Sequence, residues 1–142
     1  MKISELLAEK GENVVTIHPD TSLEQAAKQL ARYNFGVLVA SEDGKVVSGI
    51  LSERDIVRKV ADVGPEGLQV KTRSIMTRHV HTCTADNTVD DLMRLMSEHK
   101  IRHVPVVADD DSVFGMVSMT DLVKARVAEL EAETELLRSG MS

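Results

Sequence analysis

Gly49-Ile50-Leu51-Ser52-Glu53-Arg54-Asp55 returns later in the chain as Gly115-Met116-Val117-Ser118-Met119-Thr120-Asp121. In both copies a glycine and two apolar residues precede a serine, and an aspartate follows three positions after that serine. The apolar residues predict the end of a buried strand, and Ser-x-x-Asp is typical of a helix N-terminus, where serine caps the helix and the acid lies in its first turn. A strand that turns directly into a helix leaves backbone N–H groups free, so each copy predicts a site for anions such as phosphate.

The two copies belong to a longer internal duplication. At one constant offset, without a gap, the identical pairs are Val14/Val80, Thr16/Thr82, Asp20/Asp86, Asp43/Asp109, Val47/Val113, Gly49/Gly115, Ser52/Ser118, Asp55/Asp121 and Val57/Val123. A repeat this regular indicates duplication of a β-α-β-β-α unit. Each unit is too small to bury its apolar faces alone, so the two should pack together about a pseudo-twofold axis.

Hydrophobic periodicity and turn residues place the elements of each unit. In the first unit we expect a strand over 14–17 and then a helix that begins at a capping box of Thr21 and Glu24 and ends near Asn34. Strands over 35–40 and 46–51 follow around a turn at 42–45, and a helix runs from Ser52 to about residue 60. The second predicts a strand over 80–83, a helix capped at Asp86-Asn87 with its apolar stripe over 89–96, strands over 101–107 and 113–117 around a turn at 109–111, and a helix from Ser118 onward.

Helix-forming and helix-breaking residues mark what lies outside the units. Residues 3–9 place Ile3, Leu6 and Leu7 on one face of a short helix that Gly11 ends, and two glycines and a proline in 62–67 indicate a linker. The sequence therefore predicts an α/β (α+β) fold of two β-α-β-β-α repeats, with an N-terminal helix and a long C-terminal helix. The expected divisions are 1–61 for the N-terminal helix and first repeat, 62–69 for the linker, 70–125 for the second repeat and 126–142 for the helical tail.

The tail carries an apolar pattern of its own. Its residues Val123, Val127, Leu130, Thr134 and Leu137 follow a 4-3-4-3 spacing. That spacing is typical of a coiled-coil seam, although this one is shorter than three heptads and contains a threonine. A helix that packs on its own domain is the other interpretation, and both stay open. In either case the helix should cover other apolar surface, a second subunit being one candidate.

Composition excludes several classes of function. A formal charge of -6 and a pI of about 5.3 argue against general binding of DNA or RNA, and 2% aromatic residues leave no base-stacking platform. Cys83 is the only cysteine, which excludes a disulfide framework or a cysteine zinc site and fits a reducing compartment. No apolar run approaches the roughly 20 residues that span a bilayer, and the first residues lack a signal-peptide core. A cytoplasmic protein without membrane contact is expected.

With the duplication, the Ser-x-x-Asp pattern in both units and the run Ile101-Arg102-His103-Val104-Pro105-Val106-Val107, the chain resembles a tandem pair of cystathionine β-synthase (CBS) domains, a Bateman module. The resemblance covers Val14 to Lys124 and is nearest to small stand-alone bacterial CBS-pair proteins. It implies that adenine nucleotides (AMP, ADP, ATP), NAD(H) or S-adenosylmethionine bind in the clefts between the repeats, and that two modules join into a homodimer shaped as a flat disk. The second unit has Arg102-His103 where the first has Gly36-Val37, so the clefts should differ.

A nucleotide needs an apolar slot for its base, an acceptor for its ribose and donors for its phosphate. Aspartate at 55 and 121 can accept from ribose hydroxyls, and serine at 52 and 118 can donate to phosphate with the helix N–H groups. The cations placed to neutralise phosphate are at 54, 102 and 103. By the resemblance, threonine at 16 and 82 lines the base edge, beside residues 17 and 83. The predicted nucleotide-binding residues are Thr16, Ile17, Ser52, Arg54, Asp55, Thr82, Cys83, Arg102, His103, Val104, Pro105, Ser118, Thr120 and Asp121. We expect the second copy to hold the nucleotide, with Arg54 reaching its phosphate from the first.

Each of these features also has a purely structural interpretation. A single Ser-x-x-Asp is more often a capping box than a ligand site, and His103 beside Arg102 can be an ordinary strand residue. His79 and His81 alternate on one predicted strand face, but no cysteine, aspartate or glutamate completes a metal-binding set nearby. No metal site is therefore predicted.

Three hypotheses follow. The first is a regulatory module that senses cellular energy or redox state by binding an adenine nucleotide, dimerises, and passes a change in shape to a regulated protein partner. The second is a ligand-free interaction protein that works through dimerisation and its C-terminal helix. The third and least favoured is a nucleotide-processing enzyme, because the sequence offers no nucleophile–base pair, metal set or Walker-type loop. No catalytic residue and no catalytic cofactor are predicted.

Overall fold

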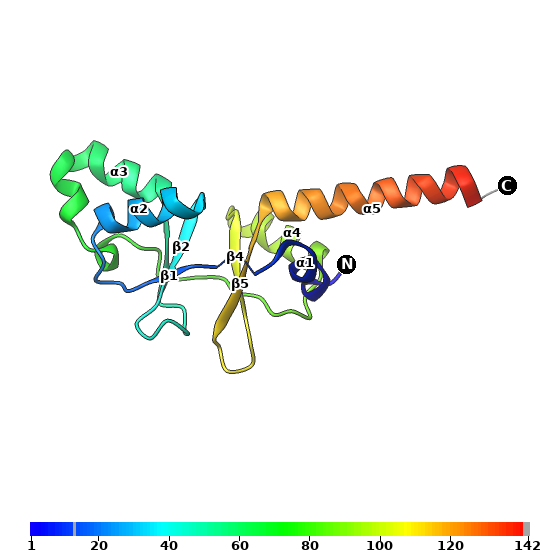
Figure 1. The fold of residues 1–142 in the computed structure, drawn as a ribbon, viewed down its shortest axis with the longest axis horizontal. Coiled ribbons are helices and arrows are strands. Elements are labelled where there is room, and N and C mark those ends of the chain that lie inside the picture. The colour runs from blue at the N-terminus through cyan, green and yellow to red at the C-terminus, as the bar shows by residue number, and fades with distance from the viewer. Residues whose placement is uncertain (13, 141–142) are drawn as a thin grey trace.

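The computed structural model describes residues 1–12 and 14–140 and arranges them as two neighbouring α/β repeats, with one long helix projecting from the body (Figure 1). The helices are α1 (Ile3–Lys10), α2 (Leu23–Tyr33), α3 (Glu53–Val63), α4 (Val89–His99) and α5 (Met119–Gly140), with short 3-10 helices η1 (Pro65–Gln69) and η2 (Thr72–Ser74). The strands are β1 (Thr16–Ile17), β2 (Val37–Ala40), β3 (Gly49–Ser52), β4 (His103–Val107) and β5 (Val113–Ser118). The predicted fold class is confirmed.

The first repeat is a three-stranded sheet packed against α2 and α3. Strand β1 pairs in parallel with β2, and β2 pairs antiparallel with β3. Helix α2 turns Leu23, Ala26 and Leu30 toward the sheet, because residues three and four apart share one helix face. With Leu38 and Leu51 of the sheet they form a core from which water is almost entirely excluded.

The second repeat keeps this plan with a smaller sheet, in which β4 and β5 pair antiparallel. The strand predicted over 80–83 is wrong in extent, since only Cys83 bonds to the neighbouring strand, in a single parallel bridge to Val106. The next amide, that of Thr84, instead donates to the Asn87 side chain at 2.9 Å. This turn draws the chain away from the sheet after one residue.

The two repeats exchange their leading segments. Helix α1 precedes the first repeat in sequence, yet Ile3, Leu6 and Leu7 are buried in the core of the second repeat, beside Leu92 and Val117. In return, Leu68, Val70 and Ile75, which lie between the repeats in sequence, pack against the core of the first. Residues 62–69, predicted as a linker, thus complete the end of α3 and form η1.

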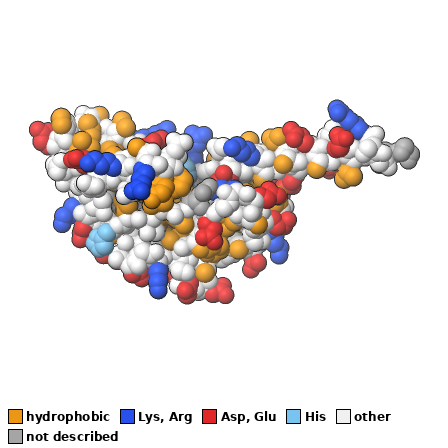
Figure 2. All heavy atoms as spheres, viewed as in Figure 1, with side chains coloured by type: hydrophobic (Ala, Val, Ile, Leu, Met, Phe, Trp, Pro, Cys, Tyr) orange, Lys and Arg blue, Asp and Glu red, His pale blue; other side chains and the backbone are white. Residues whose placement is uncertain are grey.

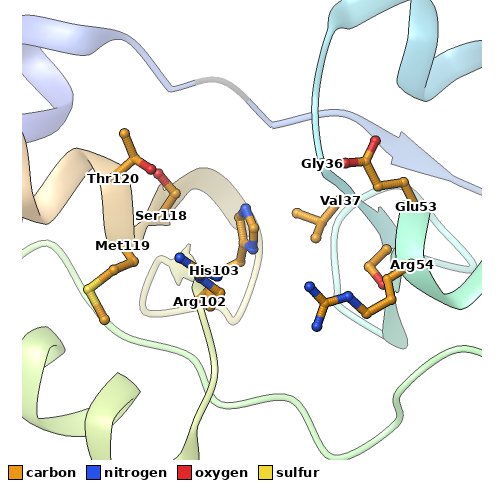
Figure 3. Close-up of a pocket in the computed structure, with 10 residues that line it drawn as sticks. Gly36, Val37, Glu53, Arg54, Arg102, His103, Ser118, Met119 and Thr120 are labelled. Atoms are coloured by element: carbon orange, nitrogen blue, oxygen red, sulfur yellow. The ribbon is translucent and has the colours of Figure 1, made fainter.

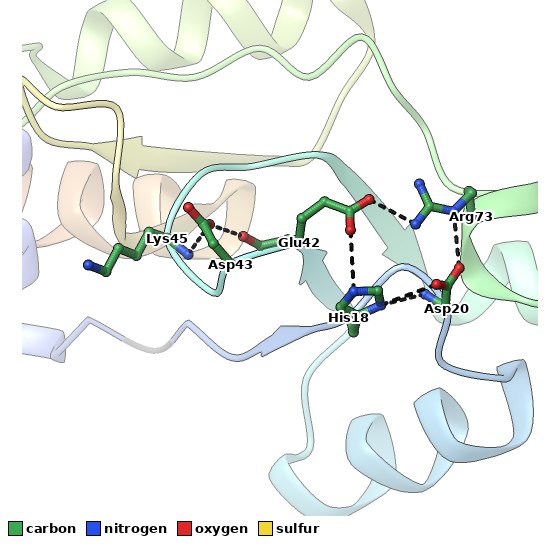
Figure 4. Close-up of polar contacts among 7 residues, drawn as sticks. His18, Asp20, Glu42, Asp43, Lys45 and Arg73 are labelled. Atoms are coloured by element: carbon green, nitrogen blue, oxygen red, sulfur yellow. Dashed lines mark hydrogen bonds and ion pairs between the residues drawn. The ribbon is translucent and has the colours of Figure 1, made fainter.

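Polar contacts also tie the segment between the repeats to the first repeat (Figure 4). Arg73 Nη2 lies 2.8 Å from a carboxylate oxygen of Glu42, and Arg73 Nε lies 3.1 Å from Asp20. The buried Thr72 hydroxyl donates to the Thr21 carbonyl at 2.8 Å. The exchanged segment is therefore held by ion pairs and a hydrogen bond as well as by apolar burial.

The caps of two helices, α2 and α4, lie one or two residues later than the sequence patterns suggested. The N-cap of α2 is Ser22, whose Oγ accepts from Gln25 N, and not Thr21. The N-cap of α4 is Thr88, which forms a capping box with Asp91, and not Asp86 or Asn87. In both cases the residue three positions after the observed cap supplies the bonded amide, so the geometry follows the usual capping pattern from a shifted start.

The sheets of the two repeats meet across an apolar layer made of Val37, Val39 and Met116. The strand predicted over 46–51 begins only at Gly49, because Val46 bridges to Ser112 of the other repeat instead of pairing with β2. Position 49 requires glycine because the segment at Met76 and Thr77 lies close to it. A Cβ placed there would lie 2.7 Å from Met76 Sδ and 2.8 Å from the Thr77 carbonyl oxygen. The repeats are thus joined along the edges that position the Ser-x-x-Asp turns.

Helix α5 begins on the body and then leaves it. Leu122 is fully buried against the second repeat, whereas residues 130–140 are all exposed. Among the described residues, no helix combines the length and the apolar character needed to cross a membrane.

Candidate functional site

The two Ser-x-x-Asp turns face a common cavity of about 400 Å³ between the repeats (Figure 3). Its ten lining residues form five pairs related by the constant offset of the duplication, which places the cavity on the pseudo-twofold axis. The pairs are Gly36/Arg102, Val37/His103, Ser52/Ser118, Glu53/Met119 and Arg54/Thr120. Six of the predicted site residues are therefore brought together here.

Both turns are built as reciprocal helix caps. Ser52 Oγ accepts from Asp55 N at 3.1 Å while a carboxylate oxygen of Asp55 accepts from Ser52 N at 2.9 Å. The corresponding distances at Ser118 and Asp121 are 3.1 and 2.8 Å. One oxygen of each aspartate is engaged in this way, and the other is left to accept from a ligand.

The first turns of α3 and α5 keep donors for an anion. The Glu53 amide donates to the Gly36 carbonyl at 3.0 Å, and the Met119 amide donates to the Arg102 carbonyl at 2.8 Å. Within the described residues, the next amides, those of Arg54 and Thr120, have no hydrogen-bond partner. Two helix N-termini thus direct open N–H groups and the positive ends of their dipoles toward one cavity.

Two arginines and a histidine line the same cavity. Arg102 and His103 project from the second repeat and Arg54 from the first, toward the space between them (Figure 3). No ion pair of the described residues involves Arg54 or Arg102. Burial lowers the pKa of His103, so this imidazole is neutral at pH 7 and acts as a hydrogen-bonding group. The two guanidinium groups are the cavity's permanent cations, against the single carboxylate of Glu53.

Two smaller clefts flank this cavity and share residues with it. One, of about 270 Å³, is lined by Lys10, Asn34, Phe35, Gly36, Val37, His103, Met116, Ser118 and Asp121. The other, of about 160 Å³, is lined by Val37, Ile50, Thr77, His79, Val80, His81, Ile101, Arg102 and His103. They are related by the duplication, since Phe35, Val37 and Met116 of the first correspond to Ile101, His103 and Ile50 of the second. The prediction that the clefts differ agrees with these linings.

The larger cleft contains an ion pair. Lys10 Nζ lies 3.0 Å from a carboxylate oxygen of Asp121 and donates to the Met116 carbonyl at 2.7 Å. Burial alone would raise the pKa of Asp121, but the hydrogen bond from the Ser118 amide and the Lys10 ammonium outweigh it, so the pKa lies below that of an ordinary aspartate. Asp121 is therefore held as a carboxylate at the edge of this cleft.

The other predicted site residues do not line these three spaces. Asp55 borders an outer groove with Arg58, Lys59, Asp62 and Ile75. The rest lie on β1, on β4 or just before α4, several of them in a core: Thr16, Ile17, Thr82, Cys83, Val104 and Pro105. Their part in ligand binding stays a prediction.

Sequence reasoning missed Lys10, Asn34 and Phe35. Asn34 and Phe35 adjoin Gly36-Val37, whose correspondence to Arg102-His103 could have indicated them. Lys10 lies outside the duplicated units, and nothing in the repeat pattern predicts that α1 crosses to the second repeat.

Cys83 provides a test of how closed the second core is. Burial raises the pKa of its thiol to about 12, so at pH 8 only about one molecule in ten thousand carries the reactive thiolate. We expect iodoacetamide to label the folded chain at least about 100-fold more slowly than the chain in concentrated urea. Mass spectrometry over time would measure both rates. Equal rates would mean that Cys83 faces an open cleft.

Comparison with known proteins agrees with this architecture of paired α/β repeats around shared clefts. The family model described as the CBS domain matches residues 4–62 and 72–128, and the chain belongs to this family. Among the described residues, no group of three or more His, Cys, Asp or Glu side chains could hold a metal ion.

Individual relatives span most of the chain. A mitochondrial CBS domain-containing protein, CBSX3 of Arabidopsis thaliana, is 32% identical over 96% of this chain and 70% of its own length. The crystal structure of the CBS-domain containing protein ATU1752 from Agrobacterium tumefaciens is 39% identical, with a TM-score of 0.81 over 88% of this chain and 98% of that one. The CBS domain protein PAE2072 from Pyrobaculum aerophilum, solved in complex with AMP, is 30% identical, with a TM-score of 0.80 over 94% and 99% of the two chains.

Proposed function

We propose that this chain is a regulatory module that binds an adenine nucleotide between its repeats and has no catalysis of its own. The observation that carries the proposal is the convergence of two arginines and two open helix N-termini on one cavity. Phosphate is the ligand group that best matches guanidinium groups and free amides together. AMP is the expected ligand. The expected function of the module is to sense cellular energy or redox state in the cytoplasm.

The cleft beside α1 suits the nucleoside. It shares Gly36, Val37, His103 and Ser118 with the central cavity, so one molecule can place its base and ribose in the cleft and its phosphate in the cavity. Phe35, Val37 and Met116 offer apolar contacts to a base, and the free oxygen of Asp121 can accept from a ribose hydroxyl. The AMP complex of the Pyrobaculum aerophilum relative supports this choice of ligand.

A ligand-free interaction module is the second candidate. It is favoured by the capping bonds that already engage the serines and aspartates of both turns, and by the exposed apolar residues of α5. In that case the clefts would serve only to join the repeats, and the projecting helix would contact a second copy or a regulated protein.

A thermal-shift series separates the two candidates. A ligand present at 100 times its dissociation constant should stabilise the fold by about 2.7 kcal/mol, which raises the melting temperature by several degrees for a chain of this size. We expect such a shift with AMP. At least one of ADP, ATP, NAD(H) and S-adenosylmethionine should give a smaller shift or none. If none of them shifts melting at millimolar concentration, the regulatory nucleotide-binding proposal fails.

The equivalence of Asp55 and Asp121 offers a matched pair of variants. Asp121→Ala should weaken AMP binding by about 1–3 kcal/mol, since it removes the acceptor at the cleft. Asp55→Ala is the control, because it removes the equivalent helix cap but Asp55 borders an outer groove. Isothermal titration with AMP and 2′-deoxy-AMP gives the readout. The penalty for the missing hydroxyl should vanish in Asp121→Ala and persist in Asp55→Ala. A penalty that is the same in both variants would remove Asp121 from the ribose site.

A further inference from the structure

The outer half of α5 is a helix without a body to pack on. Residues 130–140 are all exposed, and the helix points away from both repeats (Figure 1). Isolated helices shorter than about 12–15 residues are marginal in water, and most helices in proteins are stabilised by packing of an apolar face. This segment is therefore expected to have a partner.

The apolar residues of α5 lie along one seam. Val123, Val127, Leu130 and Leu137 are 46, 47, 52 and 62% exposed, and Thr134 occupies the remaining position of the 4-3-4-3 spacing. The Thr134 hydroxyl donates to the Leu130 carbonyl at 2.9 Å, so it can be buried without leaving an unpaired donor. Figure 2 shows hydrophobic side chains along the projecting helix, with acidic and basic groups beside them. The threonine is thus compatible with a buried seam.

The residue types of the seam favour two parallel helices. In heptad terms Val127 and Thr134 are a positions, and Leu130 and Leu137 are d positions. Branched Cβ atoms at a with leucine at d favour a two-stranded parallel coil.

The flanking charges complement a second copy of the same helix. In a parallel pair, each residue before an a position faces the residue five further along in the other helix, at an e position. Arg126 then faces Glu131 of the second copy, and Glu133 faces Arg138 of the second copy. Arg126 can exchange its own-chain contacts for this one, because those to Asp90 and Glu129 are long, at 3.6 and 3.7 Å, and join side chains that are at least a third exposed. By symmetry, four attractive pairs border the seam and none is repulsive.

We propose that α5 pairs in register with α5 of a second copy, as a parallel two-stranded coiled coil over residues 123–137. This deepens the homodimer expected of the regulatory module by naming its contact surface. It is independent of whether a nucleotide binds, because its tests use no ligand.

A pair of neighbouring leucines tests the seam. Leu136 and Leu137 are 68 and 62% exposed on the same turn, but only Leu137 lies in the seam. Light scattering at about 50 µM should give twice the 15.6 kDa of one chain for the wild type and for Leu136→Glu, and the single-chain mass for Leu137→Glu. A monomeric wild type, or a dimer that survives Leu137→Glu, would overturn the proposal. Unchanged hydrogen-exchange protection of strands β2 to β5 in Leu137→Glu would show that the body is intact and that only assembly was lost.

Cross-linking tests the orientation. In a parallel pair in register, a positions face their own counterparts, so Val127→Cys should form an intermolecular disulfide under mild oxidation. Ala132→Cys, on the outward side of the helix, is the control and should not. The native Cys83 is buried and does not compete. Cross-linking of Ala132→Cys and not of Val127→Cys would contradict the parallel coil.

Discussion

Replacing Arg54 and Arg102 together with alanine should weaken AMP binding by at least about 100-fold and leave the fold intact. A hydrogen bond to a charged group contributes about 1.5–3 kcal/mol, and 1.4 kcal/mol corresponds to a factor of ten in affinity. Both arginines line the central cavity from opposite repeats, and both are exposed, so their removal leaves no buried carboxylate without a partner. Isothermal titration at one fixed ionic strength would measure the loss, since salt screens such contacts.

The control must match the change in net charge. Arg32→Ala with Arg94→Ala removes two exposed arginines from α2 and α4, neither of which lines the cavity. This pair should bind AMP nearly as the wild type does. Adenosine, which lacks the phosphate, should bind the Arg54/Arg102 double variant and the wild type alike. If the two double variants lose the same affinity for AMP, the phosphate does not lie in the central cavity.

The duplicated pattern is the reason that much of the fold could be predicted. Because Gly49–Asp55 and Gly115–Asp121 share one offset with their surroundings, the order of strands and helices in one unit predicts that of the other. The same offset pairs the residues that line the central cavity, so a symmetric site between the turns was accessible from sequence. Arg54, Arg102 and His103, which charge and spacing single out, all line that cavity.

What sequence could not predict came from tertiary exchange. The 46–51 segment has strand-like residues, but Val46 bridges to Ser112 of the other repeat, and that contact lies far along the chain. The ion pair of Lys10 with Asp121 arises because α1 crosses to the second repeat. The burial of Cys83 in a core with α1 residues likewise follows from this crossing. A local pattern carries no information about such crossings.

Truncating Ile3 should reveal the exchange through a loss of stability in the second repeat. Ile3→Ala should cost about 2–5 kcal/mol of unfolding free energy, because Ile3 is completely buried and its removal leaves a cavity in the core. Urea denaturation measures the total, and Glu9→Ala, on the exposed face of α1, is the control with little expected effect.

Hydrogen exchange locates the damage. If α1 belongs energetically to the second repeat, amides of β4 and β5 should lose protection in Ile3→Ala before those of β2 and β3, although β2 is nearer to Ile3 in sequence. Loss confined to β2 and β3 would contradict the exchange. The same region holds Asp121, whose partner Lys10 lies at the end of α1, so a loosened α1 should also weaken AMP binding at the adjacent cleft. The N-terminal helix would then act on the ligand site through the repeat that it completes, which is the one that lies farther along the chain.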